Sequence, residues 1–148
     1  MSLQTEIMEH IKTAMKAKDT VALESLRALK SAFLLANTSG TNVTLSEADE
    51  LKIVQKLVKQ RQDSAAIYAE QGRADLAAPE LAQAKVLELF LPQQLSEDEL
   101  KKAIEEIISQ TGASSMKDMG KVMGMASKSL GGKADGKAIS EVVKKLLS

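Results

Sequence analysis

The sequence predicts an all-α protein, with an N-terminal four-helix bundle-like domain followed by a small three-helix C-terminal domain. Apolar residues recur every three or four positions along nearly the whole chain, which is the period of an amphipathic helix. No segment of strand length alternates between apolar and polar residues. Residues that favour helix starts and helix ends stand between the apolar stripes, so the boundaries can be predicted as well.

Two stripes of apolar residues predict the first two helices. The first stripe begins at Leu3 and ends near Lys18-Asp19. The second runs from Ala22 to Phe33, and Asn37-Thr38-Ser39-Gly40 is expected to stop it because these residues favour turns.

Local signals mark the third and fourth helices. Ser46 with Asp49 predicts a capping box, in which each side chain accepts a hydrogen bond from the other residue's backbone amide. Gly72 is expected to end this long helix in the left-handed conformation. Pro79 is expected at the first position of the fourth helix, where its missing amide costs nothing. That helix should stop at Pro92, because the residue before a proline disfavours helical geometry.

Three shorter helices are predicted after Pro92. Their predicted N-caps are Ser96 and Ser115, each followed three residues later by an acid (Glu99 and Asp118), and Asp135. The joint at Pro92-Gln93-Gln94 divides the chain into an N-terminal helical domain of residues 1–92 and a tail domain of residues 93–148.

Charge is balanced over the whole chain and unevenly distributed along it. The 148 residues are 44% apolar and 27% charged, which is a globular composition. Twenty basic and twenty acidic residues cancel, which argues against a general polyanion binder. However, residues 46–111 carry eight basic and thirteen acidic side chains (−5), and residues 112–148 carry seven and three (+4). An anionic partner is therefore expected to meet the C-terminal third.

Several function classes have no support in the sequence. The absence of Cys and the single histidine, His10, argue against disulfides and imidazole-rich metal sites, so no metal or cofactor is expected. No apolar run has signal-peptide or membrane-span length, so a cytoplasmic protein without membrane contact is predicted. Gly132-Lys133 is not a P-loop, because Ser127 stands at the first glycine and Ala134 at the hydroxyl position. We identify no catalytic residues.

The segment richest in glycine holds the main candidate site. Six of the eight glycines lie between residues 112 and 136, most of them close to a lysine. Glycine lets a backbone approach closely and lysine supplies positive charge, as contact with phosphate requires. The candidate nucleic-acid contacts are Lys121, Lys133, Lys137, Gly120, Gly132 and Gly136. The alternatives are that the glycines form helix corners, with Gly120 and Gly124 admitting a close helix crossing, and that the lysines only cover a solvated face.

A second group of candidates lies on the second and third helices and before the fourth. These residues are Arg27, Lys30, Lys59, Arg61 and Arg73. A guanidinium is a planar fork that can bind phosphate or carboxylate. Because Asp63 and Asp75 accompany Arg61 and Arg73, the alternative is an Arg–Asp clamp at the turn between the helices. For Arg27 and Lys30 the alternative is a solvated helix face.

Several of these segments together resemble the GatB/YqeY family. They are RALKSA at 27–32, KQRQDSA at 59–65 with Tyr68, GRADLA at 72–77, LELFLPQQLS at 87–96, MGKVM at 119–123 and GKADGK at 132–137. In order and spacing they cover nearly the whole chain and are most similar to the stand-alone YqeY-like branch. The resemblance implies two all-α parts, related to the C-terminal helical and tail portions of the B subunit of the glutamine-dependent aminoacyl-tRNA amidotransferase.

The resemblance also implies a function. In the amidotransferase these portions contact tRNA, and the kinase and transamidase chemistry lies in a preceding domain that this chain lacks. The family label, carbon–nitrogen ligase with glutamine as amido-N-donor, describes a reaction that nothing in this chain could perform alone. The resulting prediction is a tRNA-binding accessory module, with a possible protein partner in tRNA metabolism. The alternatives are a protein–protein adaptor without direct RNA contact and an independent amidotransferase-class enzyme.

Overall fold

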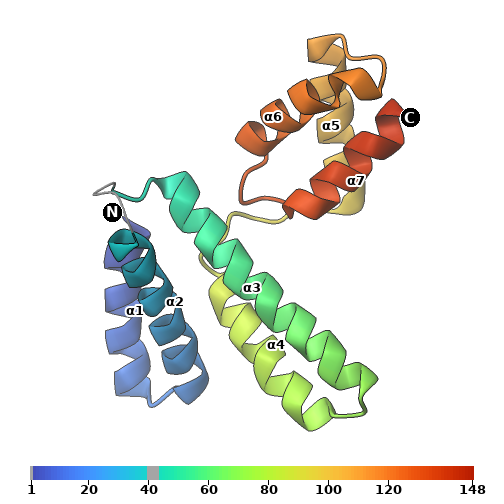
Figure 1. Cartoon of the computed structure of the whole chain (residues 1–148). Helices are drawn as coiled ribbons and strands as arrows, with labels where there is room; N and C mark the ends of the chain where they lie inside the picture. The colour runs from blue at the N-terminus through green and yellow to red at the C-terminus, as the bar shows by residue number, and fades with distance from the viewer. Residues whose placement is uncertain (1, 40–43) are drawn as a thin grey trace. The chain divides into compact units, whose positions relative to one another are not determined.

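The computed structural model describes residues 2–39 and 44–148, and over these residues its regular secondary structure is helical, without strands, which confirms the predicted fold class. Two compact units divide the chain, Met1–Leu91 and Pro92–Ser148. Figure 1 shows the helices of each unit. They are α1 (Leu3–Ala17), α2 (Thr20–Thr38), α3 (Glu47–Glu70), α4 (Ala74–Glu88), α5 (Glu97–Thr111), the short 3-10 helix η1 (Met116–Asp118), α6 (Met119–Ser129) and α7 (Gly136–Leu147).

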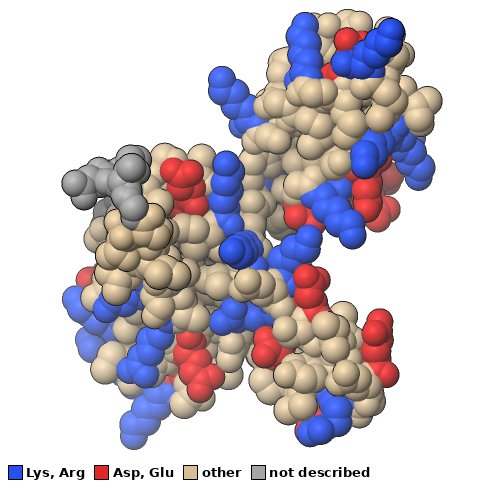
Figure 2. Space-filling model, viewed as in Figure 1, with Lys and Arg blue, Asp and Glu red and all other residues tan. Residues whose placement is uncertain are grey.

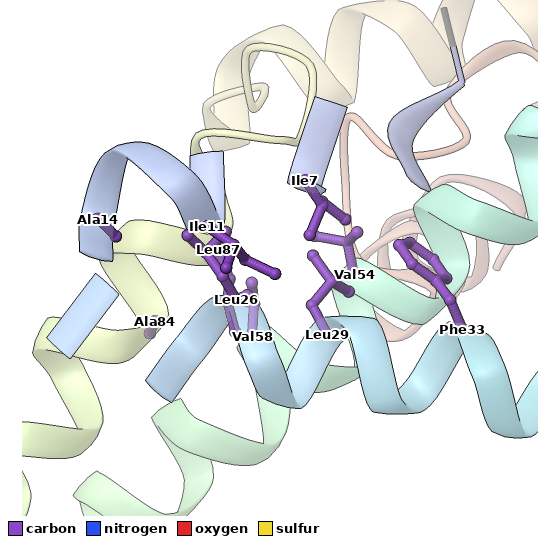
Figure 3. Close-up of a cluster of buried hydrophobic side chains, with 10 residues drawn as sticks. All are labelled: Ile7, Ile11, Ala14, Leu26, Leu29, Phe33, Val54, Val58, Ala84 and Leu87. Carbon is purple, nitrogen blue, oxygen red and sulfur yellow. The ribbon is translucent and has the colours of Figure 1, made fainter. Parts of the chain in front are cut away.

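The first unit consists of two antiparallel hairpins, α1–α2 and α3–α4, which share one hydrophobic core (Figure 1). Ile7 and Ile11 from α1 and Leu29 from α2 meet Val54 from α3 and Leu87 from α4 in this core (Figure 3). The spacing of four residues between the two isoleucines places them on one face of α1, as the predicted stripe requires. Helix α2 packs against the other three helices, so it joins the two hairpins.

The predicted caps of the third helix are confirmed. The Asp49 amide donates to Ser46 Oγ at 3.2 Å, and Asp49 Oδ2 accepts from the Ser46 amide at 3.2 Å. The Ser46 hydroxyl also donates to Asp49 Oδ2 at 2.8 Å, and this bond, together with the bond from the Ser46 amide, holds the pKa of the Asp49 carboxyl below its ordinary value of 3.8. Gly72 follows the last turn with a φ of +72°, in the predicted left-handed conformation. Helix α2 ends at Thr38, and the predicted stop at Gly40 lies outside the described residues.

The expected position of Pro79 at the start of the fourth helix is wrong. Helix α4 begins at Ala74 and contains Pro79 in its interior. The Arg73 carbonyl accepts from the amides of Leu76 (3.0 Å) and Ala77 (3.1 Å), so the helical turn is already formed before the proline. An interior proline removes one helical hydrogen bond at a cost of about 3 kcal/mol. Continuing the helix allows α4 to bury its inner face against α3, which offsets that cost.

The second unit is a three-helix domain with its own core. Ile104 from α5, Val122 from α6 and Val143 from α7 are fully buried at its centre. Ser96 caps α5 as predicted, because its Oγ accepts from the Glu99 amide at 3.2 Å. Asp135 occupies the predicted N-cap position of α7, but its side chain makes no cap hydrogen bond there.

The expected cap of the sixth helix by Ser115 and Asp118 is wrong. Ser115 precedes η1, and neither Ser115 nor Asp118 makes a side-chain cap. The Asp118 carboxylate instead accepts from the Ser114 amide at 3.0 Å. A 3-10 turn therefore separates the predicted capping pair from α6, and this turn moves the start of the helix to Met119.

Candidate nucleic-acid interface

Helix α6 presents a basic face opposite its buried face. Val122 and Ala126 turn into the core of the second unit. On the opposite side lie Lys121, Gly124 and Lys128, preceded at a spacing of four residues by Lys117 of η1, and all four residues are exposed. We refer to these four residues as the α6 stripe. It contains three cations and no acid, so it is a positively charged surface about three turns long.

The glycines of α6 serve no internal contact. A Cβ atom added to Gly120 or Gly124 would meet no other atom within 4 Å, and both residues are exposed. The expected close helix crossing at these glycines is therefore wrong. Each glycine costs the helix up to about 1 kcal/mol relative to alanine. The result is bare backbone facing solvent beside Lys121, where a bulky ligand could approach closely.

Gly132 and Lys133 form a corner between α6 and α7. Gly132 is buried, has a φ of +82°, and its carbonyl accepts from Gln94 Nε2 at 2.7 Å. The Lys133 amide donates to the Leu130 carbonyl, and the Lys133 carbonyl accepts from the Leu95 amide, both at 2.9 Å. The backbone here fixes the corner to the start of the second unit, and the Lys133 side chain is exposed.

Gly136 and Lys137 lie in the first turn of α7, and both are exposed. A Cβ at Gly136 would meet no other atom within 4 Å. The predicted candidates thus fall in three places of one unit: on α6, in the corner and at the start of α7. Lys117 and Gly124, which also belong to the α6 stripe, were not among them. The helical spacing of these residues with Lys121 is the signal that could have identified them.

The charge of the second unit is divided between its helices. Residues 92–148 contain nine basic and eight acidic side chains, a net charge of +1. Helix α5 carries two lysines and five acids, whereas residues 112–148 carry seven lysines and three acids. Lysine side chains extend into solvent around this unit (Figure 2). A polyanion is therefore attracted to α6 and α7 and repelled by α5.

Arg73 is engaged in the first unit. Its Nε donates to Asp75 Oδ1 at 3.1 Å and its Nη2 to Asp75 Oδ2 at 3.0 Å, which is a bidentate pair. The hydrogen bonds from Arg73 lower the pKa of the Asp75 carboxyl, and the same pair raises the pKa of Arg73. Arg73 therefore forms the Arg–Asp clamp at the turn between α3 and α4 that was the alternative to phosphate binding.

Arg61 has a different partner from the expected one. Its Nε donates to Gln83 Oε1 at 3.0 Å, and its Nη1 donates to the Leu57 carbonyl at 3.4 Å. Gln83 Nε2 in turn donates to Glu24 Oε2 at 3.2 Å. The expected Arg61–Asp63 clamp is therefore wrong, and Arg61 instead belongs to a polar chain that links α3, α4 and α2.

The remaining secondary candidates are exposed. Arg27 and Lys30 lie one turn apart on α2, and Lys59 lies on α3. Within the described residues, Arg27 and Lys30 have no hydrogen-bond or ion-pair partner. Arg61 and Arg73 are thus engaged internally, whereas Arg27 and Lys30 are open to a partner.

No cluster of side chains suited to a metal ion is found within residues 2–39 and 44–148. No three His, Asp or Glu side chains gather there to hold a metal ion. None of the helices in these ranges is long and apolar enough to cross a membrane.

Comparison with known proteins gives the family of the chain and two relatives. A sequence model of the family described as Yqey-like protein matches residues 4–147. The chain is 34% identical over 130 residues to altered inheritance of mitochondria protein 41, mitochondrial, of Meyerozyma guilliermondii, covering 82% of this chain and 65% of that protein. It is 30% identical over 95 residues to an uncharacterized protein of Schizosaccharomyces pombe, covering 64% of this chain and 76% of that protein. The chain thus spans less than two thirds of the length of the Meyerozyma relative.

Proposed function

We propose that this chain, which belongs to the Yqey-like protein family, is a tRNA-binding accessory module related to the tail of the aminoacyl-tRNA amidotransferase B subunit. The observation that carries the proposal is the α6 stripe, with its three exposed lysines and the open backbone at Gly124. Lys133 and Lys137 extend the basic surface to the corner and to α7.

The composition of the chain indicates which contacts it could make with RNA. Lysine ammonium groups bind phosphates as point charges, and the counterions that they displace make binding strongly dependent on salt. The chain has only two Phe and one Tyr, and Phe33 is buried in the core of the first unit. Base stacking on aromatic side chains therefore cannot be the main mode of binding. Recognition would rest on the phosphate backbone and on the shape of the folded RNA.

A salt titration of tRNA binding tests the proposal. The full chain is compared with a Lys117/Lys121/Lys128→Ala variant by filter binding at several salt concentrations. Loss of three phosphate contacts should reduce the slope of log affinity against log salt by about 2 to 3. A Lys101/Lys102→Ala variant on the acidic α5 is the matched control and should bind like wild type. Equal slopes for the wild type and the stripe variant would refute the role of α6.

A Lys133/Lys137→Ala variant measures the extension of the surface beyond α6. If the RNA follows the corner onto α7, this variant should lose a further one to two units of slope. An unchanged slope would confine the interface to the stripe. Circular dichroism of each variant should show wild-type helix content, since all these side chains are exposed.

Amide transfer belongs to another protein in this proposal. The family label of carbon–nitrogen ligase would require ammonia release from glutamine, and the pure chain is expected to release none above the buffer rate.

We place the binding role in the cytoplasm, as the sequence predicts. Because the Meyerozyma relative is named as mitochondrial, cell fractionation is the measurement that checks this location.

A further inference from the structure

A half-open apolar groove of about 340 Å³ lies between α1 and α2 in the first unit. Its floor is formed by Ile7 and Phe33, which are 1% and 2% exposed. Its rims are formed by Met8 and Leu34, which remain 40% and 63% exposed. The groove therefore has a rigid bottom that belongs to the core and two flexible apolar edges that water covers in the isolated chain.

One end of the groove is closed by polar groups. Asn37 Nδ2 of α2 donates to Gln4 Oε1 of α1 at 3.1 Å. The backbone amide of Gln4 donates to Glu50 Oε2 of α3 at 3.2 Å, and Glu50 is buried. The start of α1 is thus fixed to both α2 and α3, so the groove is preformed at this end.

The apolar surface continues beyond the groove along α1. Met15 lies seven residues after Met8, two helical turns further on, and is 56% exposed. Methionine is flexible and adapts to different partner side chains. Two exposed methionines at this spacing fit an elongated partner with a helical repeat better than a compact small molecule.

Among the described residues that line the groove, Lys30 is the one with a charged side chain. No Asp or Glu occurs from residue 25 to residue 46, whereas Arg27 and Lys30 lie on the exposed side of α2, and Lys30 lines the groove. On α1, Lys12 is paired with Glu9 at 3.1 Å and contributes little net charge. Arg27 and Lys30 have no partner among the residues that the structure describes, so one open cation lies in the groove and a second lies about one turn away on α2.

We propose that the α1–α2 groove binds an acidic amphipathic helix of a partner protein. The apolar face of that helix fills the groove and covers Met8, Met15 and Leu34, and its carboxylates pair with Arg27 and Lys30. A helix suits two antiparallel helical walls, because side-chain ridges pack into the groove between them. An RNA backbone would meet the same cations and leave the apolar rims uncovered, which is why a protein is the favoured partner. This surface and the α6 stripe lie in different units, so the inference does not depend on tRNA binding.

A display library of helical 20-residue peptides, selected on the immobilised full chain, tests the proposal. The selected sequences should carry apolar residues at i, i+3 or i+4, and i+7, with a net negative charge. The strongest peptide is then synthesised and titrated by fluorescence anisotropy. Leu34→Glu should weaken its binding at least tenfold, and Arg27→Glu/Lys30→Glu should favour a charge-reversed peptide over the original.

Leu81→Glu on α4 is the matched control, since Leu81 is an exposed leucine outside the groove. It should leave peptide binding unchanged, and wild-type hydrogen-exchange protection of α1–α4 in Leu34→Glu would show that the first unit of this variant is folded. The proposal is overturned if selection yields no excess of acidic residues or if Leu34→Glu binds the peptide as the wild type does. Self-association that Leu34→Glu abolishes would assign the groove to a second copy. Displacement of the peptide by tRNA, lost in the Arg27/Lys30 variant, would assign the groove to RNA.

Discussion

The two units have similar charge balance and use their basic residues in different ways. Residues 1–91 contain eleven basic and twelve acidic side chains, and residues 92–148 contain nine and eight. In the first unit, both Arg61 and Arg73 are held by hydrogen bonds to side chains of the same unit. In the second unit, the lysines of the α6 stripe project from a face that packs against nothing within that unit. A basic residue is therefore a candidate contact because of what surrounds it, and the number of charges does not reveal this.

The glycines show the same contrast. Gly72 in the first unit is required by its positive φ, whereas Gly120 and Gly124 in the second unit meet no conformational or packing need within the described chain. A glycine that lowers helix stability and makes no internal contact marks a position at which an external partner can be looked for. The following predictions test this contrast.

The largest expected effect is a loss of stability confined to one unit when a residue of its core is truncated. It tests whether the two cores unfold separately. Ile104→Ala should destabilise the second unit by about 2–5 kcal/mol, because Ile104 is fully buried in that unit's core. Hydrogen exchange followed by mass spectrometry should show faster exchange in α5–α7 and unchanged exchange in α1–α4. Leu87→Ala in the first unit is the reciprocal control, with the opposite pattern expected. Loss of protection in both units from either substitution would mean that they unfold together.

A second test compares a substitution that should lower only stability with one that should weaken only tRNA binding. Arg61→Ala should lower the free energy of unfolding of the first unit by about 1–2 kcal/mol, because Gln83 and the Leu57 carbonyl lose a charged donor. It should leave tRNA affinity unchanged. Lys121→Ala should leave stability unchanged and weaken tRNA binding. Urea unfolding and filter binding measure the two quantities, and a loss of tRNA affinity in Arg61→Ala would contradict the contrast between the units.

Replacing a glycine by alanine should change the stability of each unit by a smaller amount, with opposite signs in the two units. Gly124→Ala should stabilise the second unit by up to about 1 kcal/mol, because a Cβ there meets no other atom within 4 Å. Gly72→Ala should destabilise the first unit by about 1 kcal/mol, because its φ of +72° strains any other residue. Thermal unfolding monitored by circular dichroism checks both. If the open backbone serves RNA, Gly124→Ala should also bind tRNA more weakly although it is more stable, and a destabilised Gly124→Ala would reveal an internal role.

The smallest effect concerns acid stability in the first unit. The pKa of Asp49 is lowered below 3.8 by the Ser46 hydrogen bonds, so its ionised form stabilises the folded state above the unfolded pKa. This stabilisation is lost as the pH falls through the folded pKa. The wild type should therefore exceed Asp49→Asn in unfolding free energy at pH 7, and the difference should shrink below about pH 4. Urea unfolding at pH 7, 4 and 3 measures it, and a difference that stays constant over this range would contradict the capping box as its cause.

Local signals in the sequence predicted much of the fold. The capping box at Ser46 and the helix end at Gly72 depend on residues within one turn, so the sequence contains all that decides them. Pro79 was misplaced because its position depends on the turn closed by the Arg73 carbonyl and on the packing of α4 against α3. Tertiary packing can override a local preference, and a single sequence does not show it.

The candidate site was predictable to the same extent. Lys121 could be selected from charge and neighbouring glycine, and helical spacing alone would have added Lys117. The role of Arg61 could not be predicted, because its partner Gln83 lies 22 residues away and Glu24, the next member of the chain, lies 59 residues from Gln83. Only the packing of α2, α3 and α4 brings these three side chains together.

A lysine-reactivity footprint with tRNA tests the contrast between the units most directly. The full chain is acetylated with a lysine-specific reagent in the presence and absence of bulk tRNA, and each lysine is quantified by mass spectrometry. Protection by tRNA should concentrate at Lys117, Lys121 and Lys128, with Lys101 and Lys102 of α5 as unprotected references. Protection confined to lysines of α1–α4, or spread evenly over both units, would contradict the assignment of the RNA-binding surface to α6.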